Sequence, residues 1–74
     1  MQDEVKAIMA DVLGIDPSSI DDTSSTDTIE TWDSLAHINL VSALEQNFNV
    51  KLEVSEIETM ISFPAIIETL EQRI

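Results

Sequence analysis

The first apolar positions of the chain recur at the spacing of one face of an α-helix. They are Val5, Ile8, Met9, Val12 and Leu13. Gly14, the only glycine, follows directly and suits the left-handed residue that ends many helices, and Pro17 lies just beyond it. The pattern predicts a first helix over residues 2–13.

Polar, turn-forming residues dominate the next stretch. From 16 to 28 every residue is Asp, Ser, Thr or Pro except Ile20, a composition that favours turns with local side-chain hydrogen bonds. A loop of this length in a compact domain usually has a function or is disordered. The isolated apolar residue indicates that Ile20 pins the loop to the core.

A second helical pattern begins around Asp33 and Ser34 and extends to about Asn47 without Gly or Pro. The helical repeat predicts an inward stripe. It comprises His37, Leu40, Val41, Leu44 and Phe48. The opposite side is predicted to carry Leu35, Ala36, Asn39, Ala43 and Gln46.

Alternating apolar residues follow, as in a β-strand. They are Val50, Leu52 and Val54. No partner strand is evident for them, and we therefore expect an extended connection whose apolar side chains cover the bundle.

Two further helices are predicted near the C-terminus. Ser55 and Glu58 have the spacing of a capping box, which predicts a short helix with apolar Ile57, Met60 and Ile61. Ser62 or Phe63 is expected to cap a last helix with Pro64 in its first turn. The buried side of that helix is predicted to hold Phe63, Ile66, Ile67, Leu70 and Ile74.

The predicted fold class is all-α: a small bundle of three principal helices plus one short helix, with a long first loop. A chain of 74 residues has room for one core, so residues 1–74 are expected to form a single domain. With 43% hydrophobic residues it has enough apolar material to fold, and without cysteine it has no disulfide or thiolate metal site.

Acidic residues far outnumber basic ones. The chain has 3 Lys and Arg against 15 Asp and Glu, for a formal net charge of −12. We expect no nucleic-acid partner, because a phosphate backbone requires basic side chains, and no membrane partner, because anionic headgroups would repel the chain. Basic protein surfaces are the natural partners. No apolar run approaches the length of a membrane span and the N-terminus is acidic, so we expect a cytoplasmic location.

The residues from 21 to 32 have the length and acidity of a calcium loop. However, Thr26 stands where such a loop needs Gly, and Trp32 stands where it needs a bidentate Glu. No dedicated metal site is expected.

The most informative stretch is Asp33-Ser34-Leu35, where the long loop meets the second helix. The simplest interpretation is a helix cap, because Asp and Ser oxygens accept hydrogen bonds from free N–H groups at a helix start. The same position suits an attached phosphate, since the first-turn amides and the helix dipole favour negative charge.

The chain resembles the acyl carrier proteins, including peptidyl and other small carrier domains, over nearly its whole length. The resemblance rests on Asp33-Ser34-Leu35, on the apolar pattern from 40 to 48, on the acidic balance and on the order of helices. It implies that a separate phosphopantetheinyl transferase moves 4′-phosphopantetheine from coenzyme A onto Ser34. The arm ends in a thiol that holds an acyl or aminoacyl cargo as a thioester, and the chain itself catalyses nothing. This fits a sequence without cysteine.

In this family the positions matching Asp33 and Leu35 contact the transferase and other partners. We expect a docking face at the start and along the outside of the second helix, formed by Asp33, Leu35, Ala36, Asn39 and Glu45. Relatives that serve fatty acid synthesis usually carry acidic side chains there, whereas this face is nearly neutral. We therefore hypothesise a monomeric carrier for a dedicated biosynthetic pathway, with loading and processing enzymes that have basic surfaces.

His37 and Trp32 each allow more than one interpretation. Ser34 and His37 are one helical turn apart, but a hydrolytic pair also needs an orienting group and an oxyanion hole. His37 fits better as an edge residue of the inward stripe, or as the mouth of a space that holds cargo. Trp32 is expected to anchor the end of the loop, and the alternative is a place beside the arm.

The rival function is an acidic adaptor. In that interpretation the chain only binds a basic protein, and Asp33 and Ser34 serve as a helix cap and nothing more.

Overall fold

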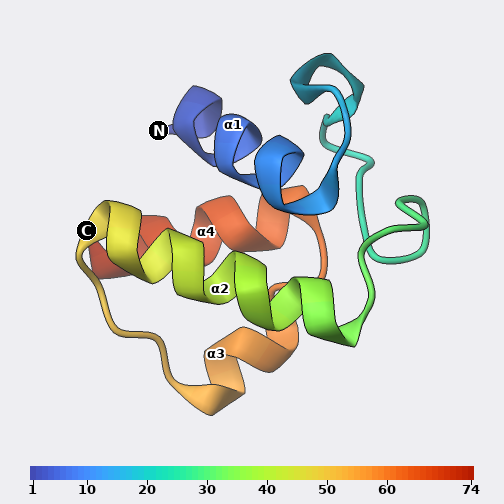
Figure 1. Ribbon diagram of the computed structural model, residues 1–74. Helices are drawn as coiled ribbons and strands as arrows, with labels where there is room; N and C mark the ends of the chain where they lie inside the picture. Colours follow the sequence, from blue (N-terminus) through green and yellow to red (C-terminus); the bar gives the residue numbers. More distant parts are fainter.

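The computed structural model describes all 74 residues. They form four α-helices and one 3₁₀ turn, joined by loops. The helices are α1 (Gln2–Leu13), α2 (Ser34–Phe48), α3 (Val54–Thr59) and α4 (Phe63–Arg73), and the 3₁₀ turn η1 is Pro17–Ser19. In Figure 1, α1, α2 and α4 surround the core, the short α3 lies beside α2, and the long loop runs along one side from α1 to α2. The predicted all-α bundle of three principal helices and one short helix is confirmed.

Local signals set the bounds of α1, as predicted. Gly14 adopts the left-handed conformation (φ 68°, ψ 37°), and its N–H donates to the carbonyl of Ala10. Any side chain other than glycine is strained there, so the only glycine of the chain stands where the backbone requires it. The inner face of the helix buries Val5, Met9 and Leu13.

Short-range hydrogen bonds shape the long loop. The Asp16 carboxylate accepts from the Ser18 N–H (2.9 Å), and the Asp21 carboxylate accepts from the Thr23 N–H (2.8 Å). The Ser18 N–H holds the pKa of Asp16 below its usual value, and the Thr23 hydroxyl (2.5 Å), followed by the Thr23 N–H, does the same for Asp21, because these bonds favour the charged form. The predicted pin is confirmed, because Ile20 is only 2% exposed.

A short antiparallel bridge between Ser25 and Ser62 ties the loop to the start of α4. The Thr26 N–H donates to the Ile61 carbonyl (3.0 Å), and the Phe63 N–H donates to the Ser24 carbonyl (2.9 Å). The loop is therefore part of the packed structure, and its last residues are held close to the segment between α3 and α4.

The inward stripe of α2 buries Leu40, Val41 and Leu44, while His37 and Phe48 are half-buried at its edges. The helix ends one residue later than expected, at Phe48, and Asn49 takes the left-handed conformation with φ 55°. On the opposite side Leu35, Asn39 and Gln46 are exposed, as predicted. Ala36 and Ala43 are half-buried, because they lie at the margins of that side.

The start of α3 differs from the prediction. Its capping interaction joins Glu53 to Glu56, whose carboxylate accepts the Glu53 N–H (2.9 Å), and the predicted pair of Ser55 and Glu58 is wrong. The chain enters the helix two residues earlier, and Val54, expected to cover the bundle, is 71% exposed. Of the predicted extended connection, Leu52 is buried and Val50 is half-buried.

Two further apolar residues differ from the prediction. Ile61 is 51% exposed, because α3 ends at Thr59 and the chain has left the helical repeat. Ile74 is 65% exposed, because it follows the last residue of α4. The remaining predicted stripe of α4 is buried, namely Phe63, Ile66, Ile67 and Leu70, and Ser62 caps the helix by accepting from the Ala65 N–H.

An ion pair joins α4 to α3. The Arg73 Nε donates to the Glu56 Oε2 (2.9 Å), and a second guanidinium nitrogen contacts the Glu56 Oε1. The pairing lowers the pKa of Glu56 and raises the pKa of Arg73.

No helix of the structure has both the length and the apolar character required to cross a bilayer.

Replacing Ile20 by Val tests the loop pin. The Ile20→Val variant removes one buried methyl group and should lower the free energy of unfolding by about 0.5–1.5 kcal/mol, measured by urea titration with circular dichroism. The matched control is Ile61→Val, the same change at a half-exposed position, which should stay within about 0.5 kcal/mol of wild type. Equal effects at the two positions would contradict the pin.

Candidate functional site

Ser34 is the first residue of α2, and its side chain faces solvent. Asp33 precedes it in an extended conformation and caps the helix, because its Oδ1 accepts from the Ala36 N–H (2.9 Å) and its carbonyl accepts from the His37 N–H (2.9 Å). The cap is therefore made by Asp33 alone. The Ser34 hydroxyl is not used in it and is open to modification.

The start of α2 also fits a phosphate on that hydroxyl. The N–H groups of Ser34 and Leu35 belong to the first turn of α2, where no helical carbonyl lies four residues earlier to accept them. They therefore have no partner within the helix. Free amides and the positive end of the helix dipole stabilise an anion at this point. An arm joined through a phosphate thus finds both an accessible oxygen and two unpaired donors.

Trp32 and His37 form a hydrogen-bonded chain beneath Ser34. The Trp32 Nε1–H donates to the His37 Nδ1 (3.1 Å), and the His37 Nε2 contacts the Ile57 carbonyl oxygen (2.9 Å). An indole nitrogen only donates and a carbonyl oxygen only accepts, so His37 carries its hydrogen on Nε2. Trp32 is 3% exposed, which confirms that its ring anchors the end of the loop.

This geometry leaves no hydrolytic pair. Both ring nitrogens of His37 are bonded to groups other than Ser34, so the ring is not placed as a base for the Ser34 hydroxyl. His37 lies at the edge of the inward stripe, half-buried, as predicted.

A surface depression of about 340 Å³ adjoins the hydroxyl. It is lined by Thr26, Trp32, Asp33, Ser34, His37 and Ile61. The residues come from the end of the loop, the first turn of α2 and the segment after α3, which the bridge between Ser25 and Ser62 brings together. Trp32 therefore anchors the loop, as predicted, and also lines the depression beside Ser34, while a place beside the arm stays a prediction.

Comparisons with known proteins agree with this geometry. The family described as "Phosphopantetheine attachment site" matches residues 3–70. The chain belongs to the acyl carrier protein family. It is 29% identical to the acyl carrier protein of Chlamydia muridarum over 73 residues, which cover 99% of this chain and 95% of the relative.

Two further relatives show the range of the similarity. The acyl carrier protein of Campylobacter curvus is 30% identical over 70 residues, 95% of this chain and 91% of the relative. "Polyketide-8 synthase acyl carrier protein 1" of Streptomyces avermitilis is 30% identical over 63 residues, 85% of this chain and 75% of the relative. As a member of this family the chain is a carrier and not a catalyst, its cofactor is 4′-phosphopantetheine, and its partners are transferases and acyl-processing enzymes.

Exposed apolar side chains flank Ser34 on this carrier. Leu35 is 69% exposed, in agreement with its predicted outward direction, and Ile38 is 64% exposed one turn later. Ile38 was not predicted as a docking residue, although its spacing of three residues from Leu35 places both on one helix face. The exposed Ile61 lines the depression at Ser34. We call these three exposed apolar residues the apolar rim: Leu35, Ile38 and Ile61.

The other predicted docking residues are placed differently from one another. Asn39 is exposed on α2 and Ala36 is half-buried. Glu45 is half-buried, and its Oε2 accepts from the Leu52 N–H (2.8 Å), which fixes the connection between α2 and α3. Glu45 thus has a structural bond in addition to its predicted contact with partners.

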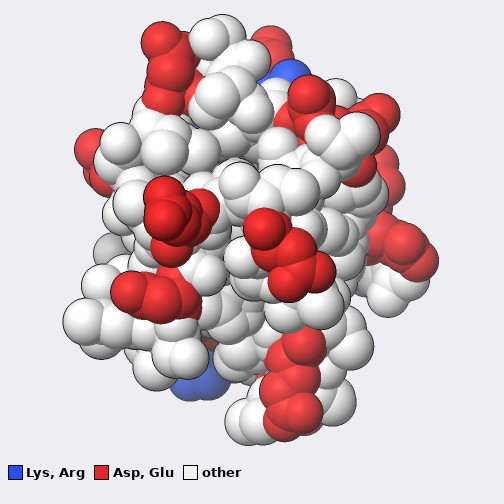
Figure 2. Space-filling model, turned by 90° about the vertical axis from the view of Figure 1, so that its right-hand side faces the viewer, with Lys and Arg blue, Asp and Glu red and all other residues white.

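Acidic side chains are frequent on the loop that precedes the site. Figure 2 shows the side of the molecule that carries the long loop, with Asp and Glu scattered around uncharged surface and little Lys or Arg. The acidic residues of the loop between α1 and α2 are all exposed. They are Asp16, Asp21, Asp22, Asp27, Glu30 and Asp33. No three His, Asp or Glu side chains are grouped so that they could hold a metal ion.

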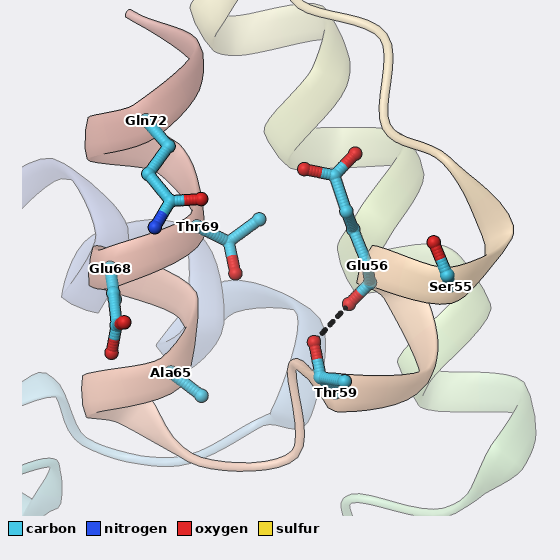
Figure 3. A pocket seen from close by; sticks show the side chains of 7 residues that line it. All are labelled: Ser55, Glu56, Thr59, Ala65, Glu68, Thr69 and Gln72. Atoms are coloured by element: carbon cyan, nitrogen blue, oxygen red, sulfur yellow. Dashed lines mark hydrogen bonds between the residues drawn. The ribbon is translucent and has the colours of Figure 1, made fainter.

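A second depression, of about 300 Å³, lies between α3 and α4 (Figure 3). Side chains of Ser55, Glu56 and Thr59 line it from α3, facing others from α4. The Thr59 hydroxyl is bonded to the Glu56 carbonyl (2.8 Å), and the Glu56 carboxylate is paired with Arg73. This depression shares no residue with the one at Ser34.

Replacing Asp33 by Ala tests the cap. The Asp33→Ala variant should lose about 0.5–2 kcal/mol of folding free energy, measured by urea titration, because the Ala36 N–H loses its acceptor. Asp27→Ala is the matched control, since it removes the same charge from an exposed loop position and should change stability by less than about 0.5 kcal/mol. A loss at Asp27 as large as at Asp33 would assign the effect to charge rather than to capping.

Proposed function

We propose that Ser34 is the residue that carries 4′-phosphopantetheine, and that residues 1–74 act as one carrier domain. The observation that supports this most strongly is the division of roles at the start of α2. Asp33 caps the helix, and the exposed Ser34 hydroxyl beside two free amides has no structural role. A chain without cysteine needs the thiol of the arm to hold cargo as a thioester.

Intact mass measurement tests the attachment. With coenzyme A, Mg²⁺ and a broad-specificity phosphopantetheinyl transferase, the wild-type chain should gain the mass of one arm. Ser34→Ala should gain none. Ser42→Ala, which alters another exposed serine of α2, should gain one arm like wild type.

The same measurement distinguishes the carrier interpretation from the adaptor interpretation. If the chain only binds a basic protein, neither wild type nor Ser42→Ala gains mass. Modification of Ser34→Ala would place the arm on another hydroxyl.

We also propose that this carrier serves a dedicated pathway rather than bulk fatty acid synthesis. The outward residues of α2 that follow Leu35 and Ile38 are mostly uncharged. Among them are Asn39, Ser42, Gln46 and Asn47. Negative charge lies instead on the preceding loop, so a partner with a basic surface would meet the loop while an apolar surface meets Leu35 and Ile38. A monomeric, cytoplasmic carrier remains our prediction.

Turnover by a ketoacyl synthase of bulk fatty acid synthesis tests the pathway. The acylated wild-type carrier should react with a kcat/KM at least roughly tenfold below that of the enzyme's own carrier. This corresponds to a deficit of about 1.4 kcal/mol in binding the transition state. The double variant Asn39→Glu/Gln46→Glu should recover part of this deficit, because it adds charge to the docking face.

The matched control is Thr69→Glu/Gln72→Glu, which adds the same charge to α4 beside the second depression. It should leave kcat/KM unchanged. Efficient turnover of wild type would contradict the dedicated pathway, and equal recovery by both double variants would assign the effect to net charge.

A further inference from the structure

We propose that Trp32, His37 and the Ile57 carbonyl close the interior of the bundle beside Ser34, so that this carrier keeps its cargo outside the core. The cargo and arm would lie against the surface depression that contains Ser34. This inference rests on attachment of the arm to Ser34, and it names the cargo class: short or polar acyl groups, for which exposure to water has little cost.

The depression at Ser34 meets the core at Trp32. This side chain lines the depression, is itself 3% exposed and packs in the hydrophobic core, so it belongs to both. His37 lines the depression beside it, with the two ring centroids 6.0 Å apart. Both side chains are fixed by the hydrogen bonds from Trp32 to His37 and from His37 to Ile57.

Opening the core at this point has a physical cost. An apolar chain that passed between α2 and α3 would have to displace the indole ring or break the bonds of His37. The Trp32 N–H and the Ile57 carbonyl would then lose their partners, and an acyl chain offers them no replacement. No buried side-chain nitrogen or oxygen lacks a partner in the closed arrangement.

The core has no room prepared for a chain. Leu40, Leu44 and Met60 are fully buried, and none of the five pockets of the molecule is lined by them. A close-packed interior accepts extra methylene groups only by shifting its side chains. The depression at Ser34 needs no such rearrangement, and it offers the Trp32 ring and Ile61 as apolar walls and the Thr26 hydroxyl as a polar one.

His37 is therefore the residue that we expect to determine cargo placement. Its neutral ring bonds simultaneously to the loop and to α3, and an apolar side chain of similar size could not do so. A His37→Leu change should free α3 from α2 and make the entry apolar.

The experiment loads Ser34 with acetyl, butyryl or octanoyl arms through the transferase and compares the Tm of the three forms. Mass measurement first establishes that each arm is attached, so a failure of the proposed function is seen before any Tm is recorded. In wild type the Tm should not rise with chain length. Hydroxylamine should also cleave the three thioesters at equal rates, because none is shielded.

In His37→Leu the Tm should rise and hydroxylamine cleavage should slow from acetyl to octanoyl, since the longer chain can now enter the core. Gln46→Leu, the matched control on the outward side of α2, should behave like wild type. Trp32→Phe provides a second test if His37→Leu does not fold, because it keeps an aromatic ring and removes the N–H donor together with part of the indole. The Tm of Trp32→Phe should also rise, and its hydroxylamine cleavage should also slow, from acetyl to octanoyl.

Comparison within each variant separates cargo burial from general loss of stability. A Tm that rises with chain length in wild type, together with slower cleavage of the octanoyl thioester, would overturn the proposal. Variants that fold and yet show no dependence on chain length would overturn the role of the hydrogen-bonded chain.

Discussion

A buried indole must find an acceptor for its N–H, and in this chain the acceptor is His37 Nδ1. That bond fixes the hydrogen of the imidazole on Nε2, which in turn binds the Ile57 carbonyl. Three separate segments, the end of the long loop, the first turns of α2 and the short α3, are joined by two bonds. None of the six residues of α3 is fully buried. Its position is held by these hydrogen bonds, by the pairing of Glu56 with Arg73 and by the packing of half-buried Ile57 against the core. Ser34 lines the same depression as Trp32 and His37.

Elements whose limits depend on neighbouring residues were predictable from the sequence. Gly14 ends α1 and Asp33 begins α2 through local backbone geometry, and the apolar repeats identify the buried faces of α1, α2 and most of α4. The isolated Ile20 was also predictable, since a single apolar residue in a polar loop has one favourable environment. For the site, the sequence indicated the exposed Leu35 and placed Ser34 at a helix start.

Features that depend on contacts between distant segments were not predictable. Ser55 and Glu58 match a capping pattern as well as Glu53 does, and only the path of the connection from α2 decides where α3 begins. The exposure of Ile61 follows from the end of α3 at Thr59, just before the bridge between the loop and the start of α4, and no local periodicity encodes that end. The bond from His37 to Ile57 spans 20 positions, and the sequence identified only that His37 lies at the edge of a stripe.

The pairing of Trp32 with Ser34 in one depression also makes the molecule its own optical probe. Trp32 is the single tryptophan of the chain, and the absence of cysteine leaves the thiol of an attached arm as the sole sulfhydryl. A thiol-directed dye on the arm would therefore form an energy-transfer pair with the indole of Trp32. No residue would have to be substituted to introduce either partner. Emission from that pair would follow the arm as it leaves the surface to meet an enzyme.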